Sequence, residues 1–409
     1  MFAWDMVGYN DTAQTPHSFG SPAEQLWSFG PVGLQLWNSL RAVDFITSLE
    51  DVDPNRVGMT GASGGATQTF LLAAVDDRVQ YFAPVNMVSA IMQGGDVCEN
   101  APGLRVGTNN VEIAAMIAPK PMILVAATGD WTRNTPAEEF PAIRKIYQLY
   151  GKPGNLETVM LDAPHNYNKE NREAVYRFFA KHILHSPDAA TLVEKNAEVR
   201  PLQDMLALFG RSAPAGALTY DQIFEQWKQR AAPAPEKAAL ARVLGTEWPN
   251  EVLSDGSALG RPGAGDRVPY TYIKGKGAPA LIIGGSPGDA PAGRPALVIE
   301  VFQTRDHSGK HFLAFNRSDD QLRVQDILTA LAWLHQKFPA TPVELTGIGT
   351  AAAIQAEFAA AVSPVPLRLR GDRSAFHGTD EDFLKYFNVP GIQLAGGLAV
   401  ADRLTAAMR

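Results

Sequence analysis

Residues 56–75 read RVGMTGASGGATQTFLLAAV, and this stretch decides the fold of the first half of the chain. Residues 56–60 are typical of a short strand, residues 61–65 of a tight turn, and residues 66–75 of a helix of small and apolar side chains. A strand that passes through a glycine-rich turn directly into a helix is typical of a parallel α/β sheet. The turn also matches the pattern Gly-x-Ser-x-Gly, with Ser63 at its centre.

A turn of this kind suits a serine that acts as a nucleophile. It holds the serine in a strained conformation and raises its hydroxyl above the carboxyl edge of the sheet. The N–H of Gly64 and the positive end of the following helix then face a developing oxyanion. We therefore predict Ser63 as the nucleophile and Gly64 as an oxyanion-hole donor. The alternative is an ordinary glycine turn with a passive serine.

A serine nucleophile needs a base and an acid, and both stand later in the chain. His165 lies in the loop DAPHNYN (162–168), after a strand predicted at 156–161. Asp130 directly follows the apolar run PMILVAA (121–127), which is typical of a strand buried on both faces. The order serine, acid, histidine is that of α/β-hydrolases. We predict His165 as the base and Asp130 as the group that orients it.

Other side chains near these positions compete for the same roles or are candidates for substrate contact. His17 lies before the turn, outside the expected chain order, so a structural or substrate-contact role suits it better than that of the base. An aromatic face suits a sugar ring or an aromatic acyl group, and core packing is the alternative role for such side chains. The predicted substrate-binding residues are His17, Trp131 and Tyr167, and the alternative acids are Asp162, Glu138 and Glu139.

Strands and helices alternate through most of the chain. Further strands are predicted at 2–7, 279–284, 296–302 and 342–346, and helices at 34–49, 137–150, 169–184 and 323–335. TGIGTA (346–351) parallels TGASGG (60–65), with Gly349 in the place of Ser63. The predicted domains are 1–185, which carries the catalytic residues, a connecting segment at 186–235, and a degenerate copy of the first fold at 236–409.

Composition limits the classes of partner. The 409 residues are 45% hydrophobic and 19% charged, with a formal net charge of -7, which disfavours nucleic acid or an anionic membrane as the main partner. No histidine stands at metal-ligand spacing, and no strand leads into a dinucleotide-binding glycine motif, so we expect neither a metal nor a cofactor. Cys98 is the only cysteine, and no apolar run is long enough to span a bilayer.

Several segments make the chain similar to the large bacterial α/β-hydrolases that include acetyl xylan esterases and dienelactone-hydrolase-like esterases. The resemblance implies an α/β-hydrolase fold, a triad of Ser63, His165 and Asp130, and hydrolysis of acyl esters, often on plant polysaccharides, without a cofactor. It also implies a second hydrolase-like half that lacks the nucleophile. The similar segments are DMVGYND (5–11), WNSLRAVD (37–44), DPNR (53–56), the turn at Ser63, DDR (76–78), GD (129–130) and PHN (164–166).

The expected activity is therefore hydrolysis of acetyl or other acyl esters of carbohydrates such as acetylated xylan. A serine peptidase of the prolyl-oligopeptidase type and a non-catalytic binding or assembly protein are the alternatives. In similar hydrolases several strands precede the segment at 5–8, so we expect a first domain without its N-terminal strands and without the loop that donates the second oxyanion N–H. An unpaired strand edge would favour association of copies into a homo-oligomer. No signal peptide is visible, and a full-length parent is expected to be secreted or periplasmic.

Overall fold

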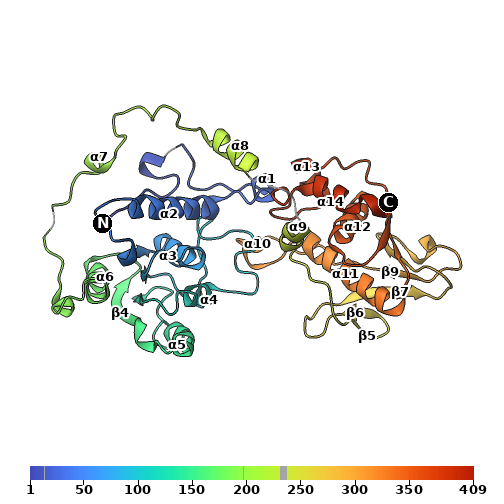
Figure 1. Ribbon diagram of the computed structural model, residues 1–409, viewed down its shortest axis with the longest axis horizontal. Coiled ribbons are helices and arrows are strands. Elements are labelled where there is room, and N and C mark those ends of the chain that lie inside the picture. The colour runs from blue at the N-terminus through green and yellow to red at the C-terminus, as the bar shows by residue number, and fades with distance from the viewer. Residues whose placement is uncertain (13, 197, 231–236) are drawn as a thin grey trace. The chain divides into compact units, whose positions relative to one another are not determined.

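The computed structural model describes residues 1–12, 14–196, 198–230 and 237–409. The chain divides into two compact units, one formed by residues 1–19 and 30–220 and the other by residues 20–29 and 221–409 (Figure 1). The segment predicted as a connection, 186–235, is thus divided between the units after residue 220, and its predicted end at 235–236 lies outside the described residues. In Figure 1 this segment follows α6 and carries the short α7.

The first unit is built on a four-stranded parallel sheet in the order β1-β2-β3-β4. The strands predicted at 56–60, 121–127 and 156–161 are confirmed with shifted ends, and β2 was not predicted. Pro84 lies within β2, and proline is unusual inside a strand that is paired on both sides. The strands are β1 (Gly58–Ala62), β2 (Tyr81–Val85), β3 (Met122–Gly129) and β4 (Leu156–Pro164).

The strand predicted at 2–7 is wrong, since these residues form no strand. The Asp5 carboxylate instead accepts hydrogen bonds from the Asn10 side chain at 2.8 Å and the Asp11 N–H at 3.2 Å. Such local bonds from a short polar side chain compete with strand pairing. The segment therefore folds back on itself as a loop that leads to His17.

Helices cover both faces of the first sheet. On one face, Met59, Phe82 and Leu124 pack against the helices α2 to α5. On the other face, Val85, Ile123 and neighbouring apolar residues pack against α6. The alternation follows from the period of two in a strand and produces three layers. The helices are α2 (Pro31–Thr47), α3 (Gly64–Val75), α4 (Asn110–Ala115), α5 (Glu139–Leu149) and α6 (Lys169–His182), which confirms the helices predicted at 34–49, 137–150 and 169–184.

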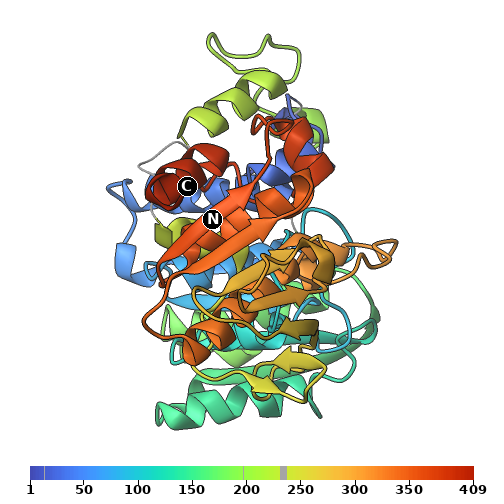
Figure 2. The ribbon, with the colours of Figure 1, turned by 90° about the vertical axis from the view of Figure 1, so that its right-hand side faces the viewer.

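The second unit contains a seven-stranded mixed sheet in the order β11-β10-β8-β9-β7-β6-β5, which faces the viewer in Figure 2. The strands predicted at 279–284, 296–302 and 342–346 correspond to β8, β9 and β10. The pairs β11–β10, β10–β8 and β8–β9 are parallel, whereas β9 pairs with β7 in antiparallel fashion. The strands are β5 (Leu253–Ser254), β6 (Ala258–Gly260), β7 (Val268–Ile273), β8 (Ala280–Ile283), β9 (Ala296–Ile299), β10 (Val343–Gly347) and β11 (Leu367–Gly371).

Helices pack mainly on one face of this sheet, where they enclose the larger hydrophobic core of the unit. The helix predicted at 323–335 is confirmed as part of α11. The remaining described helices are α7 (Leu202–Met205), α8 (Tyr220–Arg230), α9 (Lys237–Leu244), α10 (Phe312–Phe315), α11 (Asp319–Lys337), α12 (Thr350–Val362), α13 (Asp380–Tyr386) and α14 (Gly397–Thr405). Among the helices of the described ranges, none has the length and apolar character needed to cross a bilayer.

An early piece of the chain is built into the second unit. Residues 20–29 contain α1 (Pro22–Leu26), which begins with a capping box formed by Ser21 and Glu24. The carbonyls of Gln25 and Leu26 accept hydrogen bonds from the N–H groups of Gly391 and Gln393, at 2.8 and 2.9 Å. The second unit therefore includes residues 20–29, which lie nearly 200 residues before the rest of this unit at 221–409.

Candidate active site

The turn after β1 has the backbone conformation expected of a nucleophile turn. Ser63 has φ 55° and ψ -120°, in the left-handed half of conformational space that residues with a side chain rarely occupy. Its N–H donates to the Val85 carbonyl at 3.0 Å, and its carbonyl accepts from the Thr67 N–H at 3.0 Å. The strained conformation is thus held by hydrogen bonds to β2 on one side and to the first turn of α3 on the other.

Gly61 is required at this turn because the backbones of strand and helix almost touch. A Cβ on Gly61 would lie 2.4 Å from the carbonyl carbon of Gly65, whereas a Cβ on Gly65 would have no atom within 4 Å. We expect Gly61→Ala to lower the free energy of unfolding by about 1–3 kcal/mol, the usual cost of overpacking. Gly65→Ala is the matched control, and we expect it to be neutral or slightly stabilising because alanine favours helix. Urea denaturation of both variants measures the difference, and equal stabilities would contradict the prediction.

Asp130 and His165 form a hydrogen-bonded pair at the carboxyl edge of the sheet. His165 Nδ1 lies 3.0 Å from Asp130 Oδ2, and the Asp130 side chain is almost completely buried. Asp130 Oδ1 accepts hydrogen bonds from the N–H of Thr132 at 2.6 Å and from its hydroxyl. A carboxylate only accepts, so Nδ1 carries the proton and Nε2 is left with a lone pair. The arrangement can therefore deliver an imidazole that accepts a proton at Nε2.

The loop that carries His165 crosses the sheet edge from β4 towards β1. The carbonyl of Asn166 accepts a hydrogen bond at 2.9 Å from the side chain of Asn86, which stands at the end of β2. Asn86 is fully buried and has φ 52°, so both Ser63 and Asn86 use the left-handed region at neighbouring strand ends. Since β2 is the strand next to β1, this bond fixes the loop at the end of the strand beside the one that leads to Ser63.

Tyr167 extends the same crossing. Its hydroxyl lies 3.0 Å from the hydroxyl of Thr60 in β1, and Thr60 in turn donates to the Ala83 carbonyl. Burial raises the pKa of Tyr167, so the phenol stays protonated at neutral pH. Tyr167, predicted as a substrate-binding residue, thus connects the loop of His165 to β1 through its hydroxyl.

The other two predicted substrate-binding residues lie in different surroundings. The ring of Trp131 packs against the ring of His165, with centroids 4.3 Å apart, and it also contacts the core on the α3 side of the sheet. His17 Nδ1 lies 2.8 Å from the Val7 carbonyl, and its ring packs against Tyr9. Trp131 therefore forms a wall beside the imidazole, whereas the polar contact of His17 is with its own loop.

The three predicted catalytic residues follow β1, β3 and β4, whose carboxyl ends share one edge because the strands are parallel. Among the hydrogen bonds of the described residues, none joins Ser63 Oγ to His165.

Two residues of the site were not predicted from the sequence. Asn86 was missed because β2 was missed, and Thr132, whose hydroxyl and N–H both bond to Asp130, was missed as well. The available signal was the apolar run YFAPV (81–85), which is followed directly by Asn86. Asp162 accepts from the Thr128 hydroxyl at 2.7 Å and, in the described residues, makes no contact with His165.

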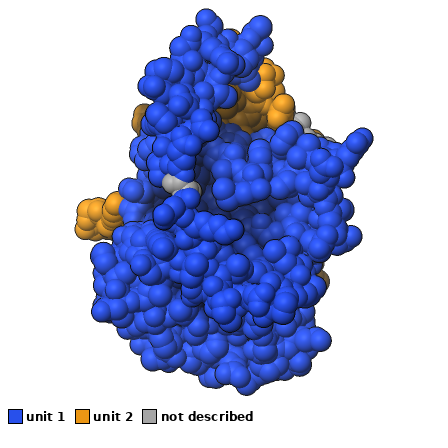
Figure 3. Space-filling view, turned by 90° about the vertical axis from the view of Figure 1, so that its left-hand side faces the viewer, with its two compact units in different colours: residues 1–19, 30–220 blue, residues 20–29, 221–409 orange. Residues whose placement is uncertain are grey.

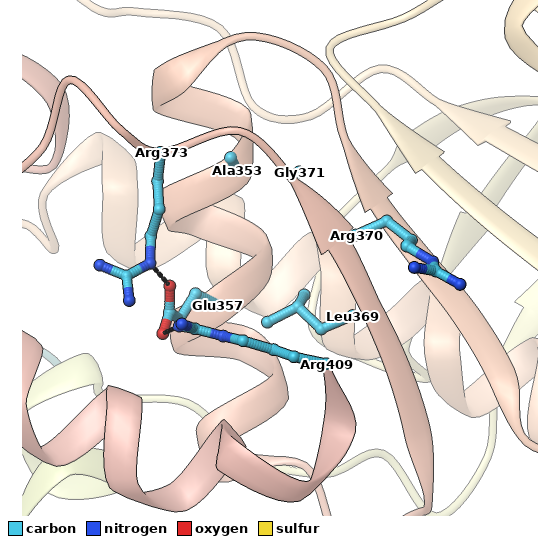
Figure 4. Close-up of a pocket in the computed structure, with 7 residues that line it drawn as sticks. All are labelled: Ala353, Glu357, Leu369, Arg370, Gly371, Arg373 and Arg409. Carbon is cyan, nitrogen blue, oxygen red and sulfur yellow. Dashed lines mark hydrogen bonds and ion pairs between the residues drawn. The ribbon is translucent and has the colours of Figure 1, made fainter.

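Two hollows can be described, one on the surface of the first unit and one in the second unit. Figure 3 shows a depression near the centre of the face of the first unit that it presents. In the second unit a cavity of about 250 Å³ lies beside α12 and β11 (Figure 4). Glu357 pairs there with Arg373 at 2.7 Å and with Arg409, and Asp402 also pairs with both arginines, so two negative charges balance two positive ones. No serine, cysteine or histidine lines this cavity, and no group of three metal-ligating side chains occurs in the described ranges.

The turn after β10 shares some features with the turn after β1. Gly349 precedes α12 with φ 84° and ψ 158°, against φ 55° and ψ -120° for Ser63. A Cβ on Gly347 would lie 2.5 Å from the backbone of Ala352, so strand and helix come close at this turn too. Since Gly349 has no side chain, this turn offers no nucleophile.

Comparison with known proteins gives a curated relative for part of the chain. No protein-family profile matches the chain. "Putative hydrolase YtaP" of Bacillus subtilis (strain 168) is 28% identical over 163 residues, which are 36% of this chain and 53% of YtaP. The first unit combines a parallel sheet with a strand, a tight glycine turn and a helix, an arrangement that fits the α/β-hydrolase fold. The match spans about half the length of YtaP.

Solved structures that are similar to part of this chain include two esterases. "Methylesterase BT1017" is 36% identical, with 44% of this chain and 40% of that chain covered and a TM-score of 0.39. A carbohydrate esterase family 15 glucuronoyl esterase from Caldicellulosiruptor kristjansonii is 15% identical, with 42% and 56% covered and a TM-score of 0.32.

Proposed function

We propose that the first unit is a serine esterase that hydrolyses acyl esters of carbohydrates through an acyl-enzyme. The observation that carries the proposal is the strained Ser63 at the sheet edge to which Asp130 and His165, a hydrogen-bonded pair, also belong. Acetylated polysaccharides such as xylan are the proposed substrates, on the resemblance to bacterial acetyl xylan esterases. The second unit, with Gly349 at the corresponding turn, is proposed as a degenerate hydrolase-like domain without catalytic function.

The proposed reaction has two halves. His165 Nε2 takes the proton of Ser63, and Ser63 Oγ attacks the ester carbonyl while the N–H of Gly64 faces the oxyanion. Collapse of this intermediate expels the alcohol, which receives the proton from His165. Water then attacks the acyl-enzyme by the same route, releases the acid and restores Ser63. Asp130 stays ionised and stabilises the imidazolium that forms in each half.

Covalent labelling tests the nucleophile directly. We expect a fluorophosphonate to modify the folded protein once, on the tryptic peptide that contains Ser63, because only an activated serine reacts with such a probe. Mass spectrometry of the peptides identifies the residue. A small acetyl ester present in excess during labelling should slow the modification, because it competes for Ser63.

The same experiment separates the competing functions. Label on another serine, or none on folded protein, would contradict the proposal and favour a binding or assembly role. Label on Ser63 together with cleavage of peptides rather than acetyl esters would favour the peptidase alternative.

A further inference from the structure

A buried carboxylate lies beside the nucleophile turn. Glu99 is only 6% exposed, and its Oε2 accepts hydrogen bonds from the N–H groups of Gly95 at 2.7 Å and Asp96 at 3.4 Å. Its Oε1 points at the turn, since a Cβ on Gly64 would lie 3.6 Å from it. Among the described residues Oε1 has no hydrogen-bond partner, and Glu99 belongs to no ion pair. One oxygen is therefore fixed by its own loop, and the other faces the residue after Ser63.

Glu99 is held in place by a buried network in its own segment. Arg105 donates to the Glu99 carbonyl at 2.9 Å and also to the side chains of Asn100 and Asn110, both at 2.9 Å. Burial lowers the pKa of Arg105 to about 10, and the charge of Glu99 opposes that shift, so the guanidinium remains protonated at neutral pH. Arg105 bonds to the backbone carbonyl of Glu99 and not to its carboxylate, so this cation leaves Oε1 unoccupied.

The segment from residue 86 to residue 110, which we call the wall segment, runs from this carboxylate to the base. The Asn110 N–H donates to Gln93 at 2.6 Å, and Gln93 donates to the Ser89 carbonyl at 2.8 Å. The Ser89 hydroxyl donates to the Trp131 carbonyl at 2.8 Å, and Trp131 packs on His165. One connected network therefore borders both the nucleophile turn and the imidazole, where a substrate has to lie.

An ionised carboxylate can only accept hydrogen bonds, and a buried one without a donor is costly. Beside a developing oxyanion its charge would also raise the reaction barrier, unless a donor reduces it. The ester carbonyl has no donor to offer, but a hydroxyl elsewhere in the substrate has one. A carboxylate on the substrate would be repelled.

We propose that Glu99 Oε1 accepts a hydrogen bond from a substrate hydroxyl, so that the site selects esters of neutral polyhydroxylated alcohols over apolar or acidic ones. This inference rests on the proposed function, and it identifies a hydroxyl of the alcohol portion as the group that the site recognises. Glu99 is then a specificity-determining residue beside the nucleophile.

Three esters with one acyl group test the proposal: glycerol monoacetate, butyl acetate and 3-acetoxypropanoate. Wild-type kcat/KM for glycerol monoacetate should exceed that for butyl acetate, and Glu99→Ala should remove roughly 10- to 100-fold of this preference, the usual worth of a hydrogen bond to a charged group. Glu99→Gln should remove part of it. Both variants should improve on 3-acetoxypropanoate, and titration of released acetic acid measures all rates.

Glu139→Gln is the matched control. Glu139 is 1% exposed and accepts the Ala90 N–H of the wall segment at 2.8 Å, but its other carboxyl oxygen is fully enclosed and cannot meet a substrate. It should leave the ratio between the esters unchanged. If Glu99→Ala fails to fold, the nearly isosteric Glu99→Gln decides alone.

Equal losses on glycerol monoacetate and butyl acetate in the Glu99 variants would overturn the proposal, because they would show a structural role. So would a wild-type enzyme that hydrolyses both esters equally well. An enzyme that hydrolyses none of the three and takes no fluorophosphonate label would instead contradict the proposed function itself.

Discussion

Replacing Ser63 with alanine should lower kcat for a small acetyl ester by roughly 10⁴- to 10⁶-fold. Without the hydroxyl no acyl-enzyme can form, and only a general contribution from the surrounding donors remains. The turn itself should survive, because Val85 and Thr67 bond to the backbone of residue 63 and not to its side chain. Steady-state kinetics with 4-nitrophenyl acetate measures the loss, and circular dichroism with thermal denaturation checks the fold.

Ser89 provides a matched control for this substitution. It is a fully buried serine whose hydroxyl donates to the Trp131 carbonyl and accepts from the Ile91 N–H, so Ser89→Ala removes two structural hydrogen bonds and no nucleophile. We expect it to cost about 1 kcal/mol of stability and much less than Ser63→Ala in rate. Turnover that is undiminished in correctly folded Ser63→Ala protein would disprove the assigned nucleophile.

Replacing Asp130 with asparagine should lower kcat by about 10⁴-fold with little change in the fold. The amide oxygen would take the two bonds from Thr132, which leaves the amide NH₂ facing His165 Nδ1. Nδ1 would then have to accept, and the proton would move to Nε2, where it prevents the imidazole from taking the proton of Ser63. The effect is thus expected to act through the tautomer of the histidine.

Asp162→Asn tests the alternative acid in the same assay. Asp162 is exposed and bonds to the Thr128 hydroxyl, so we expect less than about a threefold change in kcat, as for a surface substitution away from the site. A large loss at Asp162 with a small one at Asp130 would reverse the assignment of the acid. Raising the pH should restore part of the activity of Asp130→Asn, because hydroxide can then replace the missing base.

The parts of the fold that depend on residues close together in the sequence could be predicted from the sequence. β1, its turn and α3 follow from glycines at fixed spacing and from an apolar helix, and β3 from a continuous apolar run. β2 could not, since Pro84 contradicts strand propensity and is tolerated only through tertiary packing. Residues 2–7 have the apolar pattern of a strand, but the local bonds of Asp5 prevail.

Of the candidate site, only the residues that follow predicted strands in the expected chain order could be predicted. Asp130 and His165 are 35 residues apart, and strand order alone placed them together as candidates. The clamp of Asn86 on the histidine loop joins residues 80 apart, and the approach of Glu99 to Gly64 depends on an irregular segment with no periodic pattern. Such contacts arise from the path of loops, which residue propensities do not determine.

Because residues 20–29 belong to the second unit, the two units cannot be expressed separately by dividing the chain at one point. A fragment that starts at residue 221 would lose α1, and with it the acceptors for the N–H groups of Gly391 and Gln393 and the indole that donates to Asp380 at 3.1 Å. A fragment that stops at residue 220 would carry α1 without the core that buries Leu26. No single cut of the gene yields two intact halves, so dissection requires α1 to be supplied to the C-terminal piece, either as a grafted extension or as an added peptide.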